Sequence, residues 1–280
     1  MRDYPKVIEV QFHNRCNSNC LICPYKDMNY SPEIMDEYLF DKLISEIDEE
    51  KLVRLIPYLN NEPFLDRNFV NKIKKIREKY KKLEIEISTN ASVINKEIIS
   101  DLSKLNITEL RISVFGFAND TYKRMMPNLN QDKVFNNLAI ISEIFTETNT
   151  KVSIVMIDDG SIDEKEFIEM KELCENYKFS FERWGYLDRG DNVSYKSNDI
   201  NNPKVSSCEQ NRPLERMHIL ANGDIILCCQ DWKHTIILGN IKSQTIKEIW
   251  NSDLYNNVRD SLYNKEKISP ELCQKCKLGH

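Results

Sequence analysis

The 280-residue sequence contains little glycine and proline, with seven and nine residues of each. Disordered linkers are usually rich in these residues, so long linkers are not expected. No apolar run approaches the roughly 20 residues that a membrane-spanning helix needs. Acidic side chains outnumber basic ones, 44 to 39. Because phosphate binding needs a basic surface, this balance argues against nucleic acid as the main partner.

The amino terminus lacks a secretion signal. Residues 1–12 read MRDYPKVIEVQF, without the basic start and apolar stretch of a signal peptide. We therefore expect a cytoplasmic protein. With 41% hydrophobic and 30% charged residues, the composition is that of a globular protein. The length suffices for one sizeable core and a small second domain.

Cysteine is the residue type that needs an explanation. Nine cysteines in a cytoplasmic chain argue for metal binding, because disulfides are disfavoured in that compartment. Three lie together near the amino terminus and five lie in the last quarter of the chain. The ninth, Cys174, stands alone in a segment with helical periodicity, and we expect it to be a small core residue.

Strand-like apolar runs alternate with amphipathic segments from residue 6 to about 187. The expected strands are 7–12, 52–59, 83–88, 109–115, 151–157 and 179–187. The expected helices are 36–47, 69–76, 95–105, 132–145 and 164–176. Six βα units in a row predict an α/β fold with a parallel sheet, either open or closed into a partial barrel. Chemistry in such folds gathers at the carboxyl ends of the strands.

The composition changes after this region. Residues 189–204 are polar and rich in asparagine, which is typical of a connecting loop. A β-hairpin is expected beyond it, with strands at 217–220 and 224–228 around an Asn-Gly turn. Short helices are expected at 245–250 and 254–262. We therefore predict two domains, 1–190 and 205–280, the second a small α+β unit.

The first cysteine group, Cys16, Cys20 and Cys23, has the spacing C-x3-C-x2-C and directly follows the first expected strand. Three thiolates this close can hold one metal centre from a single loop. Structural zinc sites and electron-transfer clusters usually have four protein ligands. Three ligands therefore indicate a cluster with one iron open to an exogenous ligand. The alternative is a structural zinc site with His13 as the fourth ligand.

In this position the motif resembles that of the radical S-adenosylmethionine (SAM) superfamily, and the resemblance covers residues 6 to about 190. It implies a (βα)6 partial TIM barrel in which the three cysteines hold a 4Fe–4S cluster that binds SAM. Reduction by a flavodoxin- or ferredoxin-type protein would yield a 5′-deoxyadenosyl radical that takes a hydrogen atom from the substrate. Ile22 stands where the family often has an aromatic residue.

Segments at later strand ends also resemble the family. Asn60-Asn61-Glu62-Pro63 takes the place of a Gly-Gly-Glu-Pro segment whose acidic residue receives the amino group of SAM. Two asparagines replace the glycines of that pattern. Ser88-Thr89-Asn90 resembles a threonine–asparagine turn beside the cofactor. The resemblance implies these cofactor-binding residues: Ile22, Tyr25, Asn61, Glu62, Asn90, Ser113 and Arg124.

The second cysteine group consists of Cys208, Cys228, Cys273 and Cys276. Spacing alone fits a zinc ribbon or an iron–sulfur cluster. The element C-x14-G-x4-C resembles a SPASM domain, and four cysteines in place of seven resemble its shortened Twitch form. The resemblance implies an auxiliary 4Fe–4S cluster held by these four residues. Cys229 beside them either packs in the core or donates a hydrogen atom to a substrate radical.

A substrate radical that loses one electron to an auxiliary cluster and one proton to a base undergoes net two-electron oxidation. The short architecture resembles the aminocyclitol dehydrogenase of butirosin biosynthesis and predicts an oxidoreductase for a small hydroxylated substrate, such as a sugar or cyclitol. The alternative is a ribosomal-peptide maturase that forms thioether or carbon–carbon links or epimerises a residue. A non-catalytic zinc-binding protein is the third interpretation.

The segment FERWGYLDRGDN, at the end of the sixth expected strand, supplies the candidate catalytic residues. Arg183, Arg189 and Asp191 are candidates for the base or for substrate contact. The resemblance implies an arginine of this region in that role, without selecting one. The other interpretation is that these residues form ordinary ion pairs at a domain junction.

Overall fold

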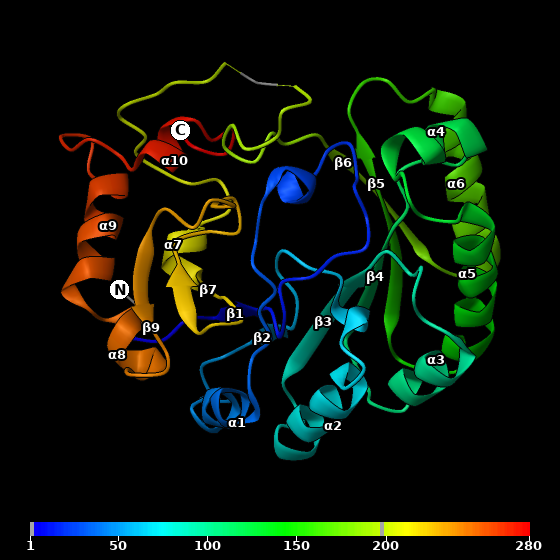
Figure 1. The fold of residues 1–280 in the computed structure, drawn as a ribbon, viewed down its shortest axis with the longest axis horizontal. Coiled ribbons are helices and arrows are strands. Elements are labelled where there is room, and N and C mark those ends of the chain that lie inside the picture. Colours follow the sequence, from blue (N-terminus) through cyan, green and yellow to red (C-terminus); the bar gives the residue numbers. More distant parts are fainter. Residues whose placement is uncertain (1–2, 197–198) are drawn as a thin grey trace. The chain divides into compact units, whose positions relative to one another are not determined.

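The computed structural model describes residues 3–196 and 199–280, and the chain divides into two compact units (Figure 1). The first, which we call the terminal unit, consists of Met1–Asn14, Asp27–Asn61 and Leu187–His280. The second, the central unit, consists of Arg15–Lys26 and Glu62–Tyr186. Each unit contains its own series of paired strands, and each cysteine group lies within one unit.

The sheet of the terminal unit has the order β2-β1-β7-β8-β9. β1 is parallel to both β2 and β7, whereas β8 is antiparallel to both β7 and β9. The strands are β1 (Val7–Val10), β2 (Arg54–Ile56), β7 (Arg216–Ile219), β8 (Asp224–Ile226) and β9 (Ile237–Asn240). The helices are α1 (Glu37–Ser45), α7 (Arg212–Glu215), α8 (Ile246–Trp250), α9 (Asp253–Tyr263) and α10 (Glu271–Gln274).

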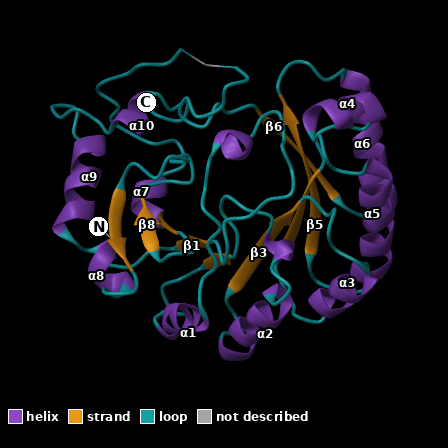
Figure 2. Ribbon diagram, in the orientation of Figure 1, coloured by secondary structure: helices purple, strands orange, loops and turns teal. Residues whose placement is uncertain are grey.

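The sheet of the central unit is parallel throughout, in the order β3-β4-β5-β6. Its strands are β3 (Glu84–Thr89), β4 (Glu109–Ser113), β5 (Lys151–Asp158) and β6 (Ser180–Gly185). Figure 2 shows its helices along one face of this sheet. They are α2 (Phe69–Lys79), α3 (Lys96–Ser103), α4 (Asn119–Met125), α5 (Gln131–Phe145) and α6 (Glu164–Tyr177). Two 3-10 turns, η1 (Pro24–Asp27) and η2 (Pro63–Leu65), complete the list.

The two faces of the central sheet differ because side chains alternate along a strand. One set is apolar and fully buried, as at Ile87, Ile112 and Ile154. The alternate positions carry a charged network in which Arg111 pairs with Glu86 at 2.5 Å and with Glu109 at 3.2 Å. This network lies toward the amino ends of the strands, which in barrels is the end associated with stability rather than catalysis.

The expected elements of the first 190 residues occur; β1, β2, β4 and β6 are shorter than predicted, whereas β5 is one residue longer. Cys174 is buried in α6, as expected of a core residue. The hairpin of β7 and β8 also occurs, and Gly223 at its turn has φ +89°, a conformation that suits glycine. Among the described residues, the elements that were not predicted are α4, α7, β9, α10 and the two 3-10 turns.

The pairing of β1 with β7 was also not predicted, and it places the two chain ends in one unit. The division into domains 1–190 and 205–280 stays a prediction. None of the helices in residues 3–196 and 199–280 has the length and apolar character that crossing a bilayer requires.

Candidate active site

The loop with the first cysteine group is held by hydrogen bonds within the central unit. The backbone N–H of Cys16 donates to Tyr25 Oη at 2.8 Å, and that of Cys23 donates to the carbonyl of Cys20 at 3.1 Å. The backbone N–H of Leu21 donates to the carbonyl of Met125, at the end of α4, at 2.9 Å. The three thiols are therefore presented from one fixed loop.

Burial makes two of these thiols, those of Cys16 and Cys20, poor acids in the absence of a metal. It raises the pKa of Cys16 to about 12, with added repulsion from Glu62 and Cys23. It also raises the pKa of Cys20 well above the usual value, again with a contribution from Cys23. A thiolate is the form that binds metal, so a cationic centre is needed to deprotonate this set.

The spacing of the three sulfur atoms argues against a single ion. A tetrahedral zinc ion holds its sulfur ligands about 3.8 Å apart, as follows from a Zn–S distance of about 2.3 Å. In the described residues, one group of three ligand atoms lies within 4.8 Å, and it does not include Cys16, Cys20 or Cys23. At least two of the three sulfur atoms therefore lie farther apart than a single zinc ion would hold them.

Glu62 is a buried carboxylate with no cation as partner among the described residues. Its oxygens accept hydrogen bonds from Thr89 Oγ1 at 2.7 Å, from the Asn90 N–H at 2.8 Å and from the Phe64 N–H at 3.2 Å. Burial raises its pKa to about 7 in spite of these three bonds. A buried carboxylate without a cation is costly, which points to a ligand that brings positive charge or N–H donors.

Other residues expected at the cofactor site lie in different surroundings. Asn90 Nδ2 donates to Asn17 Oδ1 at 3.0 Å and so contacts the cysteine loop, whereas Ile22 is buried. Asn61 belongs to the terminal unit, and its Nδ2 is buried without a hydrogen-bond partner in the part of the chain that the structure describes. The structure thus joins Ile22, Tyr25, Glu62 and Asn90 to the loop or to its immediate supports.

Ser113 and Arg124 lie farther along the central unit. Ser113 ends β4 and is half-buried. Arg124 is exposed on α4, and its Nη1 donates to Ser161 Oγ at 2.9 Å. No hydrogen bond to the cysteine loop is found for either side chain among the described residues, so their roles stay predictions.

Two residues near the loop were missed by the sequence reasoning. Tyr122 is buried on α4 near Cys20, and its Oη has no hydrogen-bond partner among residues 3–196 and 199–280. Asn17 links the loop to Asn90 and to Ser92 Oγ, at 2.8 Å from the latter. The only sequence signal for Asn17 was its place between two cysteines, and Tyr122 had none.

The second cysteine group lines one small cavity in the terminal unit. Cys208 pairs with Gly279 in a β-bridge, which brings the two ends of the SPASM-like segment together. Burial raises the pKa of Cys273 to about 12, and the thiols of Cys276 and Cys208 add to that effect. The structure therefore assembles the four predicted ligands, Cys208, Cys228, Cys273 and Cys276, around a common space.

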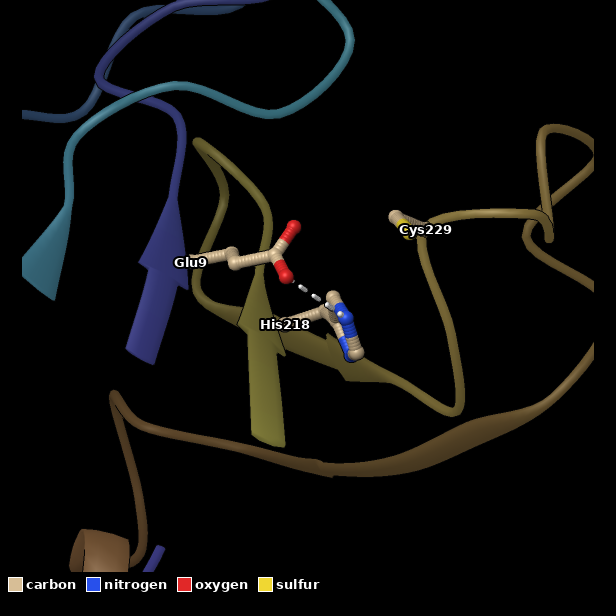
Figure 3. Close-up of side chains that lie close together, drawn as sticks. All are labelled: Glu9, His218 and Cys229. Atoms are coloured by element: carbon tan, nitrogen blue, oxygen red, sulfur yellow. Dashed lines mark ion pairs between the residues drawn. The ribbon is translucent and has the colours of Figure 1, made fainter. Parts of the chain in front are cut away.

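A third polar group, which the sequence reasoning missed, lies inside the terminal unit. Glu9 on β1, His218 on β7 and Cys229 after β8 place one ligand atom each within 4.8 Å of the others (Figure 3). His218 Nε2 is 3.5 Å from Glu9 Oε1, which also accepts from Arg216 Nη1 at 2.9 Å. The sequence signals were a glutamate in the apolar strand VIEV and a histidine in RMHI.

Electrostatics favour a charge-balanced network over a metal at this triad. Burial alone would lower the pKa of His218, but Glu9 and Cys229 raise it to about 9. Burial alone would raise the pKa of Glu9, but His218 and Arg216 lower it to about 2. Glu9 therefore faces an imidazolium and a guanidinium at neutral pH. A divalent cation would add to positive charge that is already present.

The candidate catalytic residues are divided between the units. Arg183 on β6 forms ion pairs with Asp158 at 2.7 Å and Glu164 at 2.8 Å, and its guanidinium lies 3.7 Å from the ring centre of Phe167. Arg189 lies in the terminal unit with a positive φ of 59°. Asp191, also in the terminal unit, is exposed and has φ 64°.

Arg189 contacts the loop that carries the second cysteine group. The side-chain oxygen of Gln230 faces two arginine side chains and accepts hydrogen bonds from them. One of the donors is Arg189 Nη1, at 3.1 Å. Gln230 follows Cys228 and Cys229 in the chain and is buried. Arg189 is thus tied to the cysteine cavity, whereas Arg183 is neutralised by two carboxylates in the central unit.

Comparison with known protein families gives two matches. The radical SAM superfamily matches residues 10–171, and the iron–sulfur cluster-binding domain called SPASM matches residues 208–277. Together they cover both predicted cluster sites.

Curated relatives match at low identity. The S-adenosyl-L-methionine-dependent 2-deoxy-scyllo-inosamine dehydrogenase of Niallia circulans is 22% identical over 273 residues, which cover 96% of this chain and 92% of the relative. A putative peptide biosynthesis protein of Bacillus subtilis, YydG, is 27% identical over 114 residues. That match spans 39% of this chain and only 36% of the Bacillus relative.

Solved structures show the same fold. BtrN in complex with AdoMet and 2-DOIA has a TM-score of 0.65 and 18% identity, over 99% of this chain and 94% of that chain. Streptococcus suis SuiB bound to the precursor peptide SuiA has a TM-score of 0.77 and 16% identity, over 99% of this chain and 70% of the SuiB chain. The predicted α/β class, a partial TIM barrel with a small carboxyl-terminal domain, is confirmed.

Proposed function

The chain belongs to the radical SAM superfamily, and from that membership we propose that it oxidises a small hydroxylated substrate, such as a sugar or cyclitol. It is a radical SAM enzyme with a SPASM-type domain, and its cofactors are SAM and 4Fe–4S clusters. The substrate, the reaction outcome and the roles of individual residues are the content of the proposal.

Cys16, Cys20 and Cys23 hold the SAM-binding cluster, and the four cysteines of the second group hold the auxiliary cluster. When bound, the first cluster with SAM supplies a 5′-deoxyadenosyl radical, and the second supplies an acceptor for one electron. Four protein thiolates leave the second cluster no open iron for a substrate. This complete set of four is the observation that carries the oxidation proposal.

Glu62 receives the amino group of SAM, because it is a buried acceptor without a cation. Asn90 and Tyr25 fix the cysteine loop, and Ile22 gives the adenine an apolar contact. Asn61 contributes its free N–H donors, while Ser113 and Arg124 contact the ribose and the carboxylate. Arg124 is already bonded to Ser161, so it must exchange that partner to reach the cofactor.

Oxidation of a carbinol to a carbonyl removes one hydrogen atom, one proton and one electron. A guanidinium stays protonated near neutral pH, so Arg189 binds the substrate oxygen and stabilises the negative charge that develops there. Asp191, an exposed carboxylate two residues on, accepts the proton. Arg183 is less suited to this task because Asp158 and Glu164 already neutralise it.

Two further parts of the proposal follow from the chemistry. A flavodoxin- or ferredoxin-type protein supplies the low-potential electron that starts the reaction. The cytoplasm is the expected location, because reduced thiols and iron–sulfur clusters persist there.

A peptide substrate is the second candidate, and two observations favour it. The fold likeness to SuiB has the higher TM-score, and that structure contains a precursor peptide. The Bacillus relative is named for peptide biosynthesis. On this alternative the same two clusters would serve thioether or carbon–carbon bond formation, or epimerisation.

The test uses the anaerobically reconstituted enzyme with SAM, a chemical reductant and two substrate panels. One contains aminocyclitols and sugars, and the other contains peptides. The proposal expects 5′-deoxyadenosine and a product two mass units lighter from the first panel only. Deuterium at the oxidised carbon should transfer to 5′-deoxyadenosine. Turnover of peptides alone would reject the small-molecule proposal.

A further inference from the structure

One cationic side chain shares the cavity of the second cysteine group. Arg212, at the start of α7, lines this cavity, and its Nη1 lies 3.9 Å from Cys228 Sγ. Its Nε is buried without a hydrogen-bond partner among the described residues. In the same part of the chain no carboxylate forms a salt bridge with its guanidinium. Its positive charge instead faces Cys229, Cys228 and Cys208, with Glu9 as a further negative neighbour, so it lies beside the group that the cysteines would bind.

The position of Arg212 is fixed by a buried amide. With its side-chain oxygen facing the two arginines, Gln230 accepts from Arg212 Nη1 at 3.2 Å and from Arg189 Nη1 at 3.1 Å. Gln230 is only 2% exposed. The chain Arg189–Gln230–Arg212–Cys228 therefore connects the proposed substrate-binding arginine with a thiol of the cavity.

A fixed positive charge has a definite effect on a redox centre. A 4Fe–4S core of charge 2+ with four thiolates carries a net charge of 2−, and one-electron reduction makes it 3−. A neighbouring cation stabilises the more negative state more strongly, in proportion to the charge. Net charge and hydrogen bonds to sulfur are known to set the potential of such clusters.

We propose that Arg212 is a positioning residue that raises the reduction potential of the auxiliary cluster, and that Gln230 holds it against Cys228. This inference rests on the proposed cluster at the four cysteines. Arg212 makes that cluster a better acceptor for the one electron that the substrate loses, while the proton leaves separately to Asp191. Atoms and electrons then balance for oxidation of a carbinol to a carbonyl.

The test is an anaerobic redox titration followed by electron paramagnetic resonance. It uses the full chain with Cys16, Cys20 and Cys23 replaced by alanine, so that only the auxiliary cluster gives a signal. Arg212→Met removes the charge at similar volume, and Arg212→Lys keeps it. Arg216→Met is the matched control, because Arg216 lies in the same unit and pairs with Glu9.

Arg212→Met should lower the midpoint potential of the auxiliary cluster by about 59 mV. For one electron this is about a tenfold decrease in the equilibrium constant for accepting the electron. Arg212→Lys should shift it less, and Arg216→Met should leave it unchanged. An unchanged potential in Arg212→Met, with iron content intact, would overturn the proposal. If both Arg212→Met and Arg212→Gln hold no iron while Arg212→Lys does, Arg212 serves cluster assembly instead, and the proposal also fails.

Failure of the proposed function gives a different result. If the background variant itself contains no iron, the cavity holds no auxiliary cluster, and the oxidation proposal loses its electron acceptor. A normal iron content and the expected Arg212 effect in this background, combined with no oxidised product from the enzyme that carries all its cysteines, would retain this inference and reject only the substrate class.

Discussion

The two cysteine sites differ in the charge that the protein keeps beside the thiols. The site in the central unit has three cysteines and a buried carboxylate, Glu62, which has no cationic partner among the described residues. The site in the terminal unit has four cysteines and a cation, Arg212, which forms no salt bridge with a carboxylate in the part of the chain that the structure describes. The first arrangement suits a ligand that brings an amino group, whereas the second suits a centre that takes up negative charge. The contrast explains how one chain can use two clusters for different steps.

Removing the auxiliary ligands should have the largest effect on the reaction outcome. In Cys273→Ala we expect 5′-deoxyadenosine to form while the oxidised product is lost, because the substrate radical has no electron acceptor. Liquid chromatography with mass spectrometry measures both compounds. Cys174→Ala is the control, since that cysteine is a core residue of α6. Full product yield from Cys273→Ala would show that the second site is not needed as an acceptor.

Replacing the carboxylate of Glu62 tests whether the first cysteine site binds the amino group of SAM. Glu62→Gln keeps the shape of the side chain but removes its charge, and we expect SAM to bind about 10- to 100-fold more weakly. This range corresponds to the roughly 1.5–3 kcal/mol of a charged hydrogen bond. Equilibrium dialysis on the reconstituted enzyme measures the affinity, and iron content checks that the cluster is present. Equal affinity would remove Glu62 from the cofactor site.

The pH dependence of SAM binding should reveal the titration of Glu62. Its pKa is raised to about 7 by burial, so the carboxylate is the main form only above that pH. A bound amino group needs the carboxylate, and affinity should therefore fall up to tenfold per unit as the pH drops below 7. The affinity of Glu62→Gln should stay flat from pH 6 to 8. A flat profile in the wild type would contradict this account.

The smallest expected effect concerns the Glu9–His218 pair. The pKa of His218 rises from 6.5 in the unfolded chain to about 9 in the folded protein. Its contribution to the free energy of unfolding is therefore complete below pH 6.5 and is lost as the pH rises through 9. The pKa of Glu9 is lowered from 4.5 to about 2, so its contribution to the free energy of unfolding declines below pH 4.5 and is lost as the pH falls through about 2. Near pH 6, His218→Gln should unfold more easily than wild type by about 1–3 kcal/mol.

Thermal unfolding followed by circular dichroism checks this difference between pH 6 and 10. The two proteins should converge above pH 9. A difference that does not depend on pH would assign His218 to packing alone.

Local patterns explain what could be predicted from the sequence. The strands and helices of the βα series have periodicities that extend over single segments, and both cysteine groups have recognisable spacing. Glu62 was predictable because it follows the second strand in a known motif position. These features need no information on residues far away in the chain.

The remaining features arise from contacts between distant segments. The pairing of β1 with β7 joins residues about 200 positions apart and leaves no local signal. Arg212, Gln230 and His218 become notable only through their neighbours in space. The pairing of Arg183 with Asp158 and Glu164 also depends on the register of β5 and β6, which the sequence does not specify.

The most direct test of two functionally distinct clusters is the iron and sulfide content after anaerobic reconstitution. Wild type should hold about eight irons, and the Cys16/Cys20/Cys23→Ala variant about four, with SAM cleavage lost. That result would assign one cluster to each unit. Four irons in wild type and none in the variant would mean that the terminal unit holds zinc or no metal, which would contradict the account.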